Sequence, residues 1–285
     1  MSIDTLILSG GSTKGICFLG SINYLIDNGY LDKRLTNIKK IICVSASFVF
    51  ILSVILLEYD YDYLEKYLLN VDFNNILDIN DISLKSIINE YGFINYNKNH
   101  IYIQKILKDK YNIKSMSLLK LYKISNIHII VKVVNVTEQK VQYFDHINNP
   151  KINILKLIQM TTAIPVLLKP IKYKNNLYQD GGLSGNCPIE INDSDKYLCI
   201  EILPNKLNKE IRNVFDFATY SWNMYTPDIL IRKYDKKNIK IDLTKLNLNL
   251  SNFDVDLTTK KKCINEGYEQ TKEHFNHQYL PSGRN

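Results

Sequence analysis

Hydrophobic positions in the first sixty residues follow one order twice: a short apolar run, then a helical pattern. Residues 5–9 predict a buried strand, and residues 14–28 carry apolar side chains at helical spacing up to the stop signal Asn28-Gly29. Residues 38–44 predict a second strand, with a strongly apolar helix at 46–57 directly behind it. Two such units favour the α/β class, with a mainly parallel central sheet between helices.

The rest of the chain adds a helical region and more strands. Residues 59–123 are polar, rich in tyrosine and helical in pattern, so we expect helices that cap or flank the sheet. Residues 127–136 are mostly β-branched and predict a central strand, with 141–144 as its hairpin partner. A short helix and two further strands are predicted at 152–160, 177–180 and 197–203. The sequence shows no internal repeat or linker, so we expect one domain over 1–285.

Charge and cysteine content narrow the function classes. The formal net charge of +7 suits contact with anionic lipid headgroups, but the basic residues are scattered and nucleic acid is not an expected partner. The chain has five cysteines, an odd number, and none of them forms a CxxC pair. This argues for a reducing compartment and against a zinc site. We therefore expect no metal and no cofactor. The oligomeric state stays open.

The first residues of the chain and one long apolar stretch bear on whether the protein is secreted or inserted into a membrane. The first residues lack the apolar core of a secretory signal, which predicts a cytoplasmic protein with peripheral contact to membranes. Residues 41–57 are uncharged and raise the alternative of a membrane anchor. The stretch falls short of the roughly 20 apolar residues that a spanning helix needs, and it contains several serines. We interpret it as a buried strand and helix.

A glycine-rich segment follows the first predicted strand. Its residues 9–15 place glycines at a helix start, where backbone N–H groups favour negative charge. A phosphate loop requires Lys followed by Ser or Thr, whereas Lys14 precedes Gly15 here. The dinucleotide fingerprint requires glycine where Ser12 stands. The segment therefore suits the oxyanion of acyl transfer, and a purely structural glycine turn is the alternative.

Two further segments carry candidate catalytic groups. Ser45 follows the second strand and precedes its helix, where a sharp turn would expose the hydroxyl. The usual G-x-S-x-G pattern has Cys43 and Ser47 in place of its glycines, and a serine that merely caps the helix is the alternative. Asp180 ends a predicted strand and is followed by Gly181-Gly182, a pattern that an ordinary hairpin turn would also produce.

In their order and spacing, the three segments together resemble the patatin-like phospholipases. That family has a glycine-rich loop ending in a basic residue and glycine, then a serine elbow, then a distant Asp-Gly-Gly. The resemblance extends over nearly the whole chain, through residues 134–137, 143–144, 161–165 and 267–268. It implies a patatin-like three-layer sandwich.

The resemblance also implies a mechanism without histidine. Asp180 would act as general base and Ser45 as nucleophile on an ester carbonyl of a phospholipid or another acyl-ester lipid. The resemblance places the oxyanion hole at Gly10, Gly11, Ser12 and Thr13. It implies supporting roles for Lys14, Gly15, Gly181 and Gly182.

Departures from the family pattern keep a second reading open. Ser12, Cys43 and Ser47 stand where the family has glycine. A side chain at a position of positive φ costs about 1–2 kcal/mol, so we expect backbone strain at these three residues. The alternative function is a pseudoenzyme that keeps the scaffold and binds lipid or a protein partner without turnover.

Overall fold

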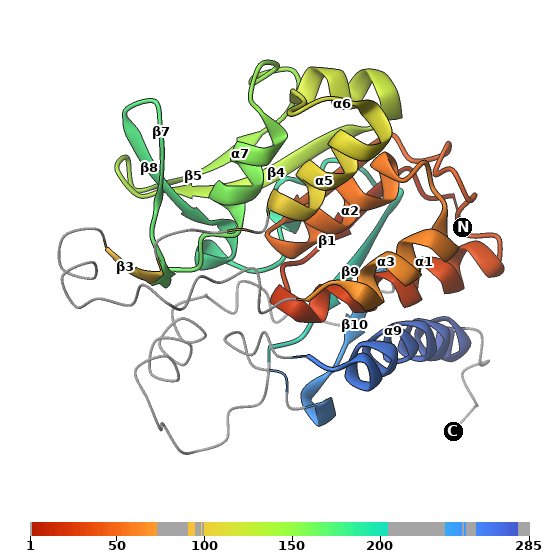
Figure 1. Cartoon of the computed structure of the whole chain (residues 1–285). Coiled ribbons are helices and arrows are strands. Elements are labelled where there is room, and N and C mark those ends of the chain that lie inside the picture. The colour runs from red at the N-terminus through yellow and green to blue at the C-terminus, as the bar shows by residue number, and fades with distance from the viewer. Residues whose placement is uncertain are drawn as a thin grey trace.

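A mainly parallel sheet forms the centre of the protein (Figure 1). The computed structural model describes residues 2–72, 91–94, 98, 100–204, 237–246, 248 and 255–278. The eight-stranded sheet has the order β10-β9-β1-β2-β4-β8-β7, and β5 pairs with β4 outside this path. Its strands are β1 (Thr5–Leu8), β2 (Lys40–Val44), β4 (His128–Asn135), β5 (Lys140–Phe144), β7 (Ile171–Tyr173), β8 (Asn176–Asp180), β9 (Tyr197–Ile202) and β10 (Asn238–Ile241).

Strand direction separates the sheet into two parts. The strands β10, β9, β1, β2 and β4 run parallel, whereas β5 and β8 run antiparallel to β4 and β7 antiparallel to β8. The predicted α/β class, with its mainly parallel sheet, is confirmed. The predicted hairpin of β4 and β5 is also present. A separate parallel pair consists of β3 (Gly92–Ile94) and β6 (Val166–Leu168).

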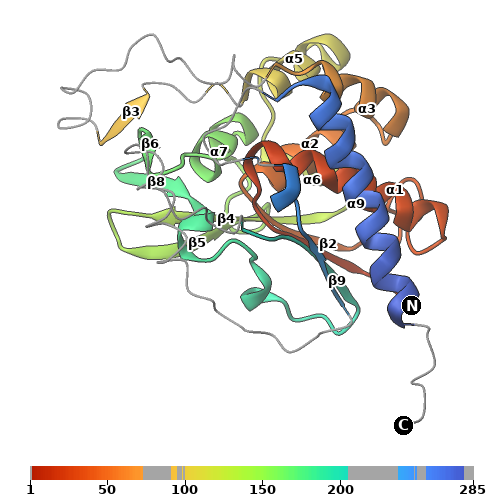
Figure 2. The same ribbon diagram turned by 90° about the horizontal axis from the view of Figure 1, so that it is seen from below.

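Helices pack on one face of the sheet through the larger of two apolar clusters. That cluster joins Leu8 and Ile41 of the sheet with Phe18 and Phe48 of the helices, all fully buried. The described helices are α1 (Cys17–Asp27), α2 (Ala46–Leu56), α3 (Tyr61–Asn70), α5 (His100–Tyr111), α6 (Leu118–Ser125), α7 (Ile154–Thr161) and α9 (Leu257–Gln278). Figure 2 shows α9 lying along α1.

The second face carries the alternate side chains of the same strands. Ile7, Ile42 and Ile130 form a smaller cluster there, together with Cys199 of β9. Ile189 covers them from the 3₁₀ turn η5 (Ile189–Ile191), in the segment between β8 and β9. Because successive residues of a strand point to opposite faces, the near-continuous apolar runs of β1, β2 and β4 supply both clusters.

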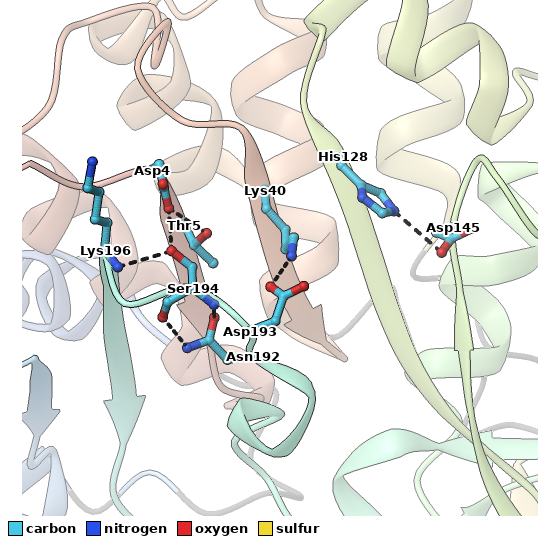
Figure 3. A network of polar contacts seen from close by, with 9 residues as sticks. All are labelled: Asp4, Thr5, Lys40, His128, Asp145, Asn192, Asp193, Ser194 and Lys196. Atoms are coloured by element: carbon cyan, nitrogen blue, oxygen red, sulfur yellow. Dashed lines mark hydrogen bonds and ion pairs between the residues drawn. The ribbon is translucent and has the colours of Figure 1, made fainter.

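The segment after η5 is anchored at the amino-terminal ends of the parallel strands (Figure 3). Lys40 at the start of β2 pairs with Asp193, and the hydroxyl of Ser194 donates to Asp4 Oδ1 at 2.7 Å. Beside them, His128 Nε2 at the start of β4 lies 3.4 Å from Asp145 Oδ2. These contacts stabilise the amino-terminal ends of the strands. α/β folds bind their ligands at the other side, at the carboxyl ends of the strands.

Two sequence expectations need correction. The helical region predicted over 59–123 contains α3, α5 and α6, but β3 is a strand within it, and 73–90 lies outside the described residues. The membrane-anchor reading of 41–57 is wrong, because the stretch divides into β2, a turn at Ser45 and the eleven-residue α2. None of the described helices combines the length and hydrophobicity of a membrane span.

Candidate active site

Ser45 occupies a strained turn between β2 and α2. Its backbone has φ 57° and ψ −126°, a conformation that residues other than glycine rarely adopt. The backbone N–H of Ser45 donates to Thr161 Oγ1 at 2.8 Å, and that hydroxyl donates to the carbonyl of Lys132, also at 2.8 Å. The surrounding structure therefore holds the turn in place, as the strained serine elbow of a hydrolase requires.

Asp180 lies against the hydroxyl of Ser45. Ser45 Oγ donates to Asp180 Oδ2 at 2.6 Å instead of capping α2, so the helix-cap alternative is wrong. The other oxygen, Asp180 Oδ1, accepts the N–H of Gly182 at 2.8 Å. Burial raises the pKa of Asp180 to about 7, against the opposing effect of these two hydrogen bonds and of the Lys132 charge. A carboxyl of this pKa can take and return a proton near neutral pH.

Strand register brings these two residues together. Val44, the last residue of β2, pairs with Lys132 of β4, and the next residue of β4, Val133, pairs with Asp180 on the opposite side. Ser45 and Asp180 therefore flank one position of β4, with their backbones about two strand spacings, roughly 10 Å, apart. Their side chains close this gap from the two sides, although 135 residues separate them in the sequence.

The glycine-rich loop lies beside this pair. The N–H of Gly10 donates to the carbonyl of Asn186 at 3.0 Å, and the Asn186 side-chain amide donates to the carbonyl of Gly10 at 3.0 Å. Gly10 is therefore tied to the segment that follows Asp180. Gly11 leads into the 3₁₀ turn η1 (Ser12–Ile16), which precedes α1.

Backbone strain falls at different residues than the sequence predicts. Ser12 has φ 50°, so the expected strain is present there. Cys43 lies within β2 and Ser47 within α2, elements in which φ is negative, so the expectation is wrong for both. The Ser47 hydroxyl lies 2.8 Å from the carbonyl of Val44 and accepts the Val44 N–H at 3.0 Å. Ser47 thus satisfies the backbone below the turn.

Lys14 lies within η1, and its side chain reaches the segment after β9. It is buried, and its ammonium donates to the carbonyl of Leu203 at 3.4 Å. Burial lowers the pKa of Lys14, while the neighbouring Cys17, Cys263 and Asp242 favour its charged form. The contact with Leu203 ties Lys14 to the segment that follows β9.

A largely apolar cavity of about 110 Å³ opens beside Ser45. The 3₁₀ turn η1 contributes Ser12, Thr13 and Gly15 to its wall. Its apolar lining comes mainly from α2, α3 and the region around β6, namely Ala46, Val49, Phe50, Leu68, Val71, Ile164 and Leu168. An apolar wall next to a hydroxyl–carboxylate pair suits a substrate with a reactive polar group and an apolar tail.

Sequence reasoning did not assign a role to Thr161, Lys132 or Asn186. Thr161 lies within a segment that carries the family resemblance, and Asn186 follows closely after Asp180-Gly181-Gly182, so their contacts with Ser45 and Gly10 had a signal in the sequence. Lys132 had a different signal: it is a lysine in the middle of a β-branched strand pattern. A charge at such a position is rarely buried unless it is paired.

Fold and site together define an α/β protein with a serine on a strand-to-helix turn and an aspartate hydrogen-bonded to it. The sequence model of the patatin-like phospholipase family matches residues 6–193, about two thirds of the chain. The chain therefore belongs to the patatin-like phospholipase family.

Two relatives that match in sequence come from viruses. An uncharacterized protein of Acanthamoeba polyphaga mimivirus, R571, is 26% identical over 288 residues, covering 95% of this chain and 93% of that protein. A protein of Invertebrate iridescent virus 6, named probable lipid hydrolase 463L, is 28% identical over 279 residues, covering 93% of this chain and 87% of its own length.

Two solved structures with a similar fold are of bacterial proteins. VipD from Legionella pneumophila superposes with a TM-score of 0.64 at 18% identity, over 97% of this chain and 67% of VipD. ExoU of the type III secretion system of Pseudomonas aeruginosa, solved in complex with SpcU, gives a TM-score of 0.50 at 13% identity. That match covers 98% of this chain but 53% of ExoU, so the chain spans about half of ExoU's length. At such low identity both similarities concern the fold alone.

Proposed function

We propose that this protein hydrolyses fatty-acyl esters of phospholipids or related lipids, with Ser45 as nucleophile and Asp180 as general base. The observation that carries the proposal is the 2.6 Å hydrogen bond from Ser45 Oγ to Asp180 Oδ2 at the wall of an apolar cavity. Membership of the patatin-like phospholipase family supports it, as does the name of the iridescent-virus relative, probable lipid hydrolase.

In the proposed mechanism, Asp180 in its ionised form takes the proton of Ser45 while Ser45 Oγ attacks the ester carbonyl. The ester C–O bond then breaks, Asp180 returns the proton to the departing alcohol, and the acyl group stays on Ser45. Water attacks this acyl-enzyme with Asp180 again as base, which releases the fatty acid and restores the serine. The pKa of about 7 allows Asp180 to serve in both directions near neutral pH.

The glycine-rich loop is the proposed source of the oxyanion hole. The N–H of Gly10 already donates to Asn186, so we assign the donors to Gly11, Ser12 and Thr13 and a loop-positioning role to Gly10. Ser12 and Thr13 line the cavity next to Ser45, and η1 begins at Ser12. A preorganised donor of this kind commonly contributes about 3 kcal/mol to transition-state stabilisation.

The cavity supports an acyl chain as the apolar part of the substrate. Its wall is built mainly of aliphatic and aromatic side chains, which favour removal of a hydrocarbon tail from water. The formal net charge of +7 is consistent with peripheral contact to anionic lipid surfaces, where such substrates are found. The lipid substrate and this membrane contact are parts of the same proposal.

Labelling of the active serine tests the proposal directly. A fluorophosphonate should modify Ser45, as peptide mapping would identify, because Ser45 Oγ lies against its base. Ser45→Ala should lose the label and the hydrolysis of a labelled phospholipid and of a p-nitrophenyl ester. Ser47→Ala is the matched control, since the Ser47 hydroxyl bonds to the carbonyl of Val44 and not to Asp180, and it should keep both.

Two outcomes would contradict the proposal. Modification of Ser47 instead of Ser45 would overturn the choice of nucleophile. A folded protein that neither reacts with the probe nor hydrolyses either ester would favour the pseudoenzyme reading, to which the strained Ser12 in the glycine-rich loop points.

A further inference from the structure

Lys132 is a buried charge that neither the apolar core nor the proposed mechanism explains. It lies in the middle of β4, its side chain is 1% exposed, and its sequence neighbours Val131 and Val133 are fully buried. Burial of an ammonium is unfavourable unless hydrogen bonds and an opposite charge compensate for the lost water. An apolar residue would serve a purely structural strand at this position better.

The ammonium of Lys132 has three acceptors, which matches its three donors. Nζ donates to the carbonyls of Ser184 and Gly185 at 3.2 and 3.0 Å, and it pairs with Glu190 Oε1 at 2.6 Å. The hydroxyl of Tyr143 on β5 donates to the same oxygen of Glu190. The two carbonyls belong to the 3₁₀ turn η4 (Gly181–Ser184) and the residue after it, directly behind Asp180.

The backbone of Lys132 touches the other half of the site. Its carbonyl accepts the hydroxyl of Thr161, which in turn accepts the N–H of Ser45. A Cβ atom on Gly181 would lie 2.4 Å from the same carbonyl, so the turn after Asp180 passes as close to β4 as a glycine allows. Residue 132 therefore contacts the supports of both Ser45 and Asp180.

We propose that Lys132 is a positioning residue for the Ser45–Asp180 pair: its ammonium clamps the turn behind Asp180 and stabilises the negative charge of that carboxylate. The inference rests on the proposed function. Asp180 pairs with Val133, so the Lys132 side chain leaves β4 on the opposite face of the sheet and acts from behind the site.

The groups around Asp180 support an electrostatic effect of Lys132. Two neutral donors face the carboxylate: the Ser45 hydroxyl before α2 and the Gly182 N–H on η4. From α7, the Thr161 hydroxyl contacts the Ser45 N–H and not the carboxylate. From β4 comes the charge of Lys132, which lowers the pKa of Asp180 against the effect of burial. Glu190 on η5 partly neutralises that charge, and Tyr143 on β5 holds Glu190.

A pH profile separates this role from a merely structural one. Lys132→Met removes the charge but keeps an unbranched side chain, so the acid limb of kcat/KM should move to higher pH by roughly 0.5 units or more. Glu190→Gln leaves the Lys132 charge without its counter-ion and should move the limb to lower pH. Lys132→Arg keeps a charge and should restore the wild-type limb. Lys140→Met removes an exposed lysine of the same hairpin and should change nothing.

A carboxyl titration keeps the inference testable without turnover. The carbon-13 signal of the Asp180 carboxyl, assigned by its loss in Asp180→Asn, should titrate at higher pH in folded Lys132→Met and at lower pH in Glu190→Gln. An unchanged titration in Lys132→Met, or shifts of the same sign in both variants, would overturn the role of Lys132. If Lys132→Met does not fold, the direction in which Glu190→Gln shifts the titration of Asp180 decides: a shift to lower pH supports the role of Lys132, and a shift to higher pH overturns it. A wild-type protein without hydrolysis or probe labelling would instead refute the proposed function.

Discussion

At the scale of single residues, two features of the site are energetically unfavourable, one in backbone conformation and one in electrostatics. Ser45 has a positive φ, and Asp180 is a carboxyl only 3% exposed to solvent. Burial disfavours the ionised form of Asp180, which is the form that the proposed mechanism needs. Such unfavourable features at a site are expected where activity and stability oppose each other.

The buried carboxyl leads to a prediction about stability. The pKa of Asp180 is about 7 in the folded protein against 3.8 for a free aspartate. Its contribution to stability is therefore full below about pH 3.8 and is lost as the pH rises through about 7. Asp180→Asn does not ionise, so its free energy of unfolding should exceed that of the wild type increasingly from pH 5 to pH 8, by at most roughly 4 kcal/mol.

Thermal unfolding of both proteins at the two pH values measures this effect. The variant should also lose turnover, because an amide cannot accept the Ser45 proton. A difference in unfolding free energy that is equal at pH 5 and pH 8 would show that Asp180 does not carry the raised pKa.

At the scale of elements, the packing of α1 against α9 positions the glycine-rich loop. Gly20 of α1 and Gly267 of α9 lie at the crossing, where a Cβ on Gly267 would be 2.1 Å from the carbonyl of Cys17. The hydroxyl of Ser21 donates to the carbonyl of Gly267 at 3.1 Å across the same contact. Because η1 leads directly into α1, the position of this helix also decides where Ser12 and Thr13 lie.

Gly267→Ala tests the importance of this crossing. The added methyl group would meet backbone that cannot rotate away, so we expect a loss of about 3 kcal/mol or more in unfolding free energy, measured by urea denaturation. Gly29→Ala is the control. Gly29 lies just after α1 with φ 72° and open space around it, so only backbone strain of about 1 kcal/mol is expected. Equal losses for both variants would contradict a tight crossing.

At the scale of the whole molecule, the apolar core includes residues well beyond the part of the chain that matches the family model. The match ends at residue 193, whereas β9, β10 and α9 follow it and complete the sheet and the packing on α1. Leu198, Ile239 and Cys263 of these elements are buried in the main apolar cluster. The single-domain organisation over 1–285 stays a prediction.

Metal independence is expected of the whole protein. Among the described residues, no group of three histidine, cysteine or carboxylate side chains is placed to bind a metal ion. The proposed mechanism assigns stabilisation of the oxyanion to backbone N–H groups instead. Phospholipid hydrolysis should therefore continue unchanged in the presence of EDTA, measured with the labelled phospholipid. Loss of activity with EDTA and its return with calcium would contradict this expectation.

The sequence by itself determined the α/β class and the places of the site residues along the chain. Apolar periodicity and small residues at turns act over a few positions, so β1, β2, β4 and the turn at Ser45 could be predicted from local pattern. The same applies to the position of Asp180 at the end of β8.

Only the tertiary structure decided how these parts meet. The register of β2 and β8 on β4 brings Ser45 within 2.6 Å of Asp180, and a shift by one residue would turn side chains to the other face. Folding also places the strain at Ser45 instead of Cys43 and Ser47, and it buries Lys132 behind the turn that follows Asp180. These contacts join residues far apart in the chain, so no local pattern could encode them.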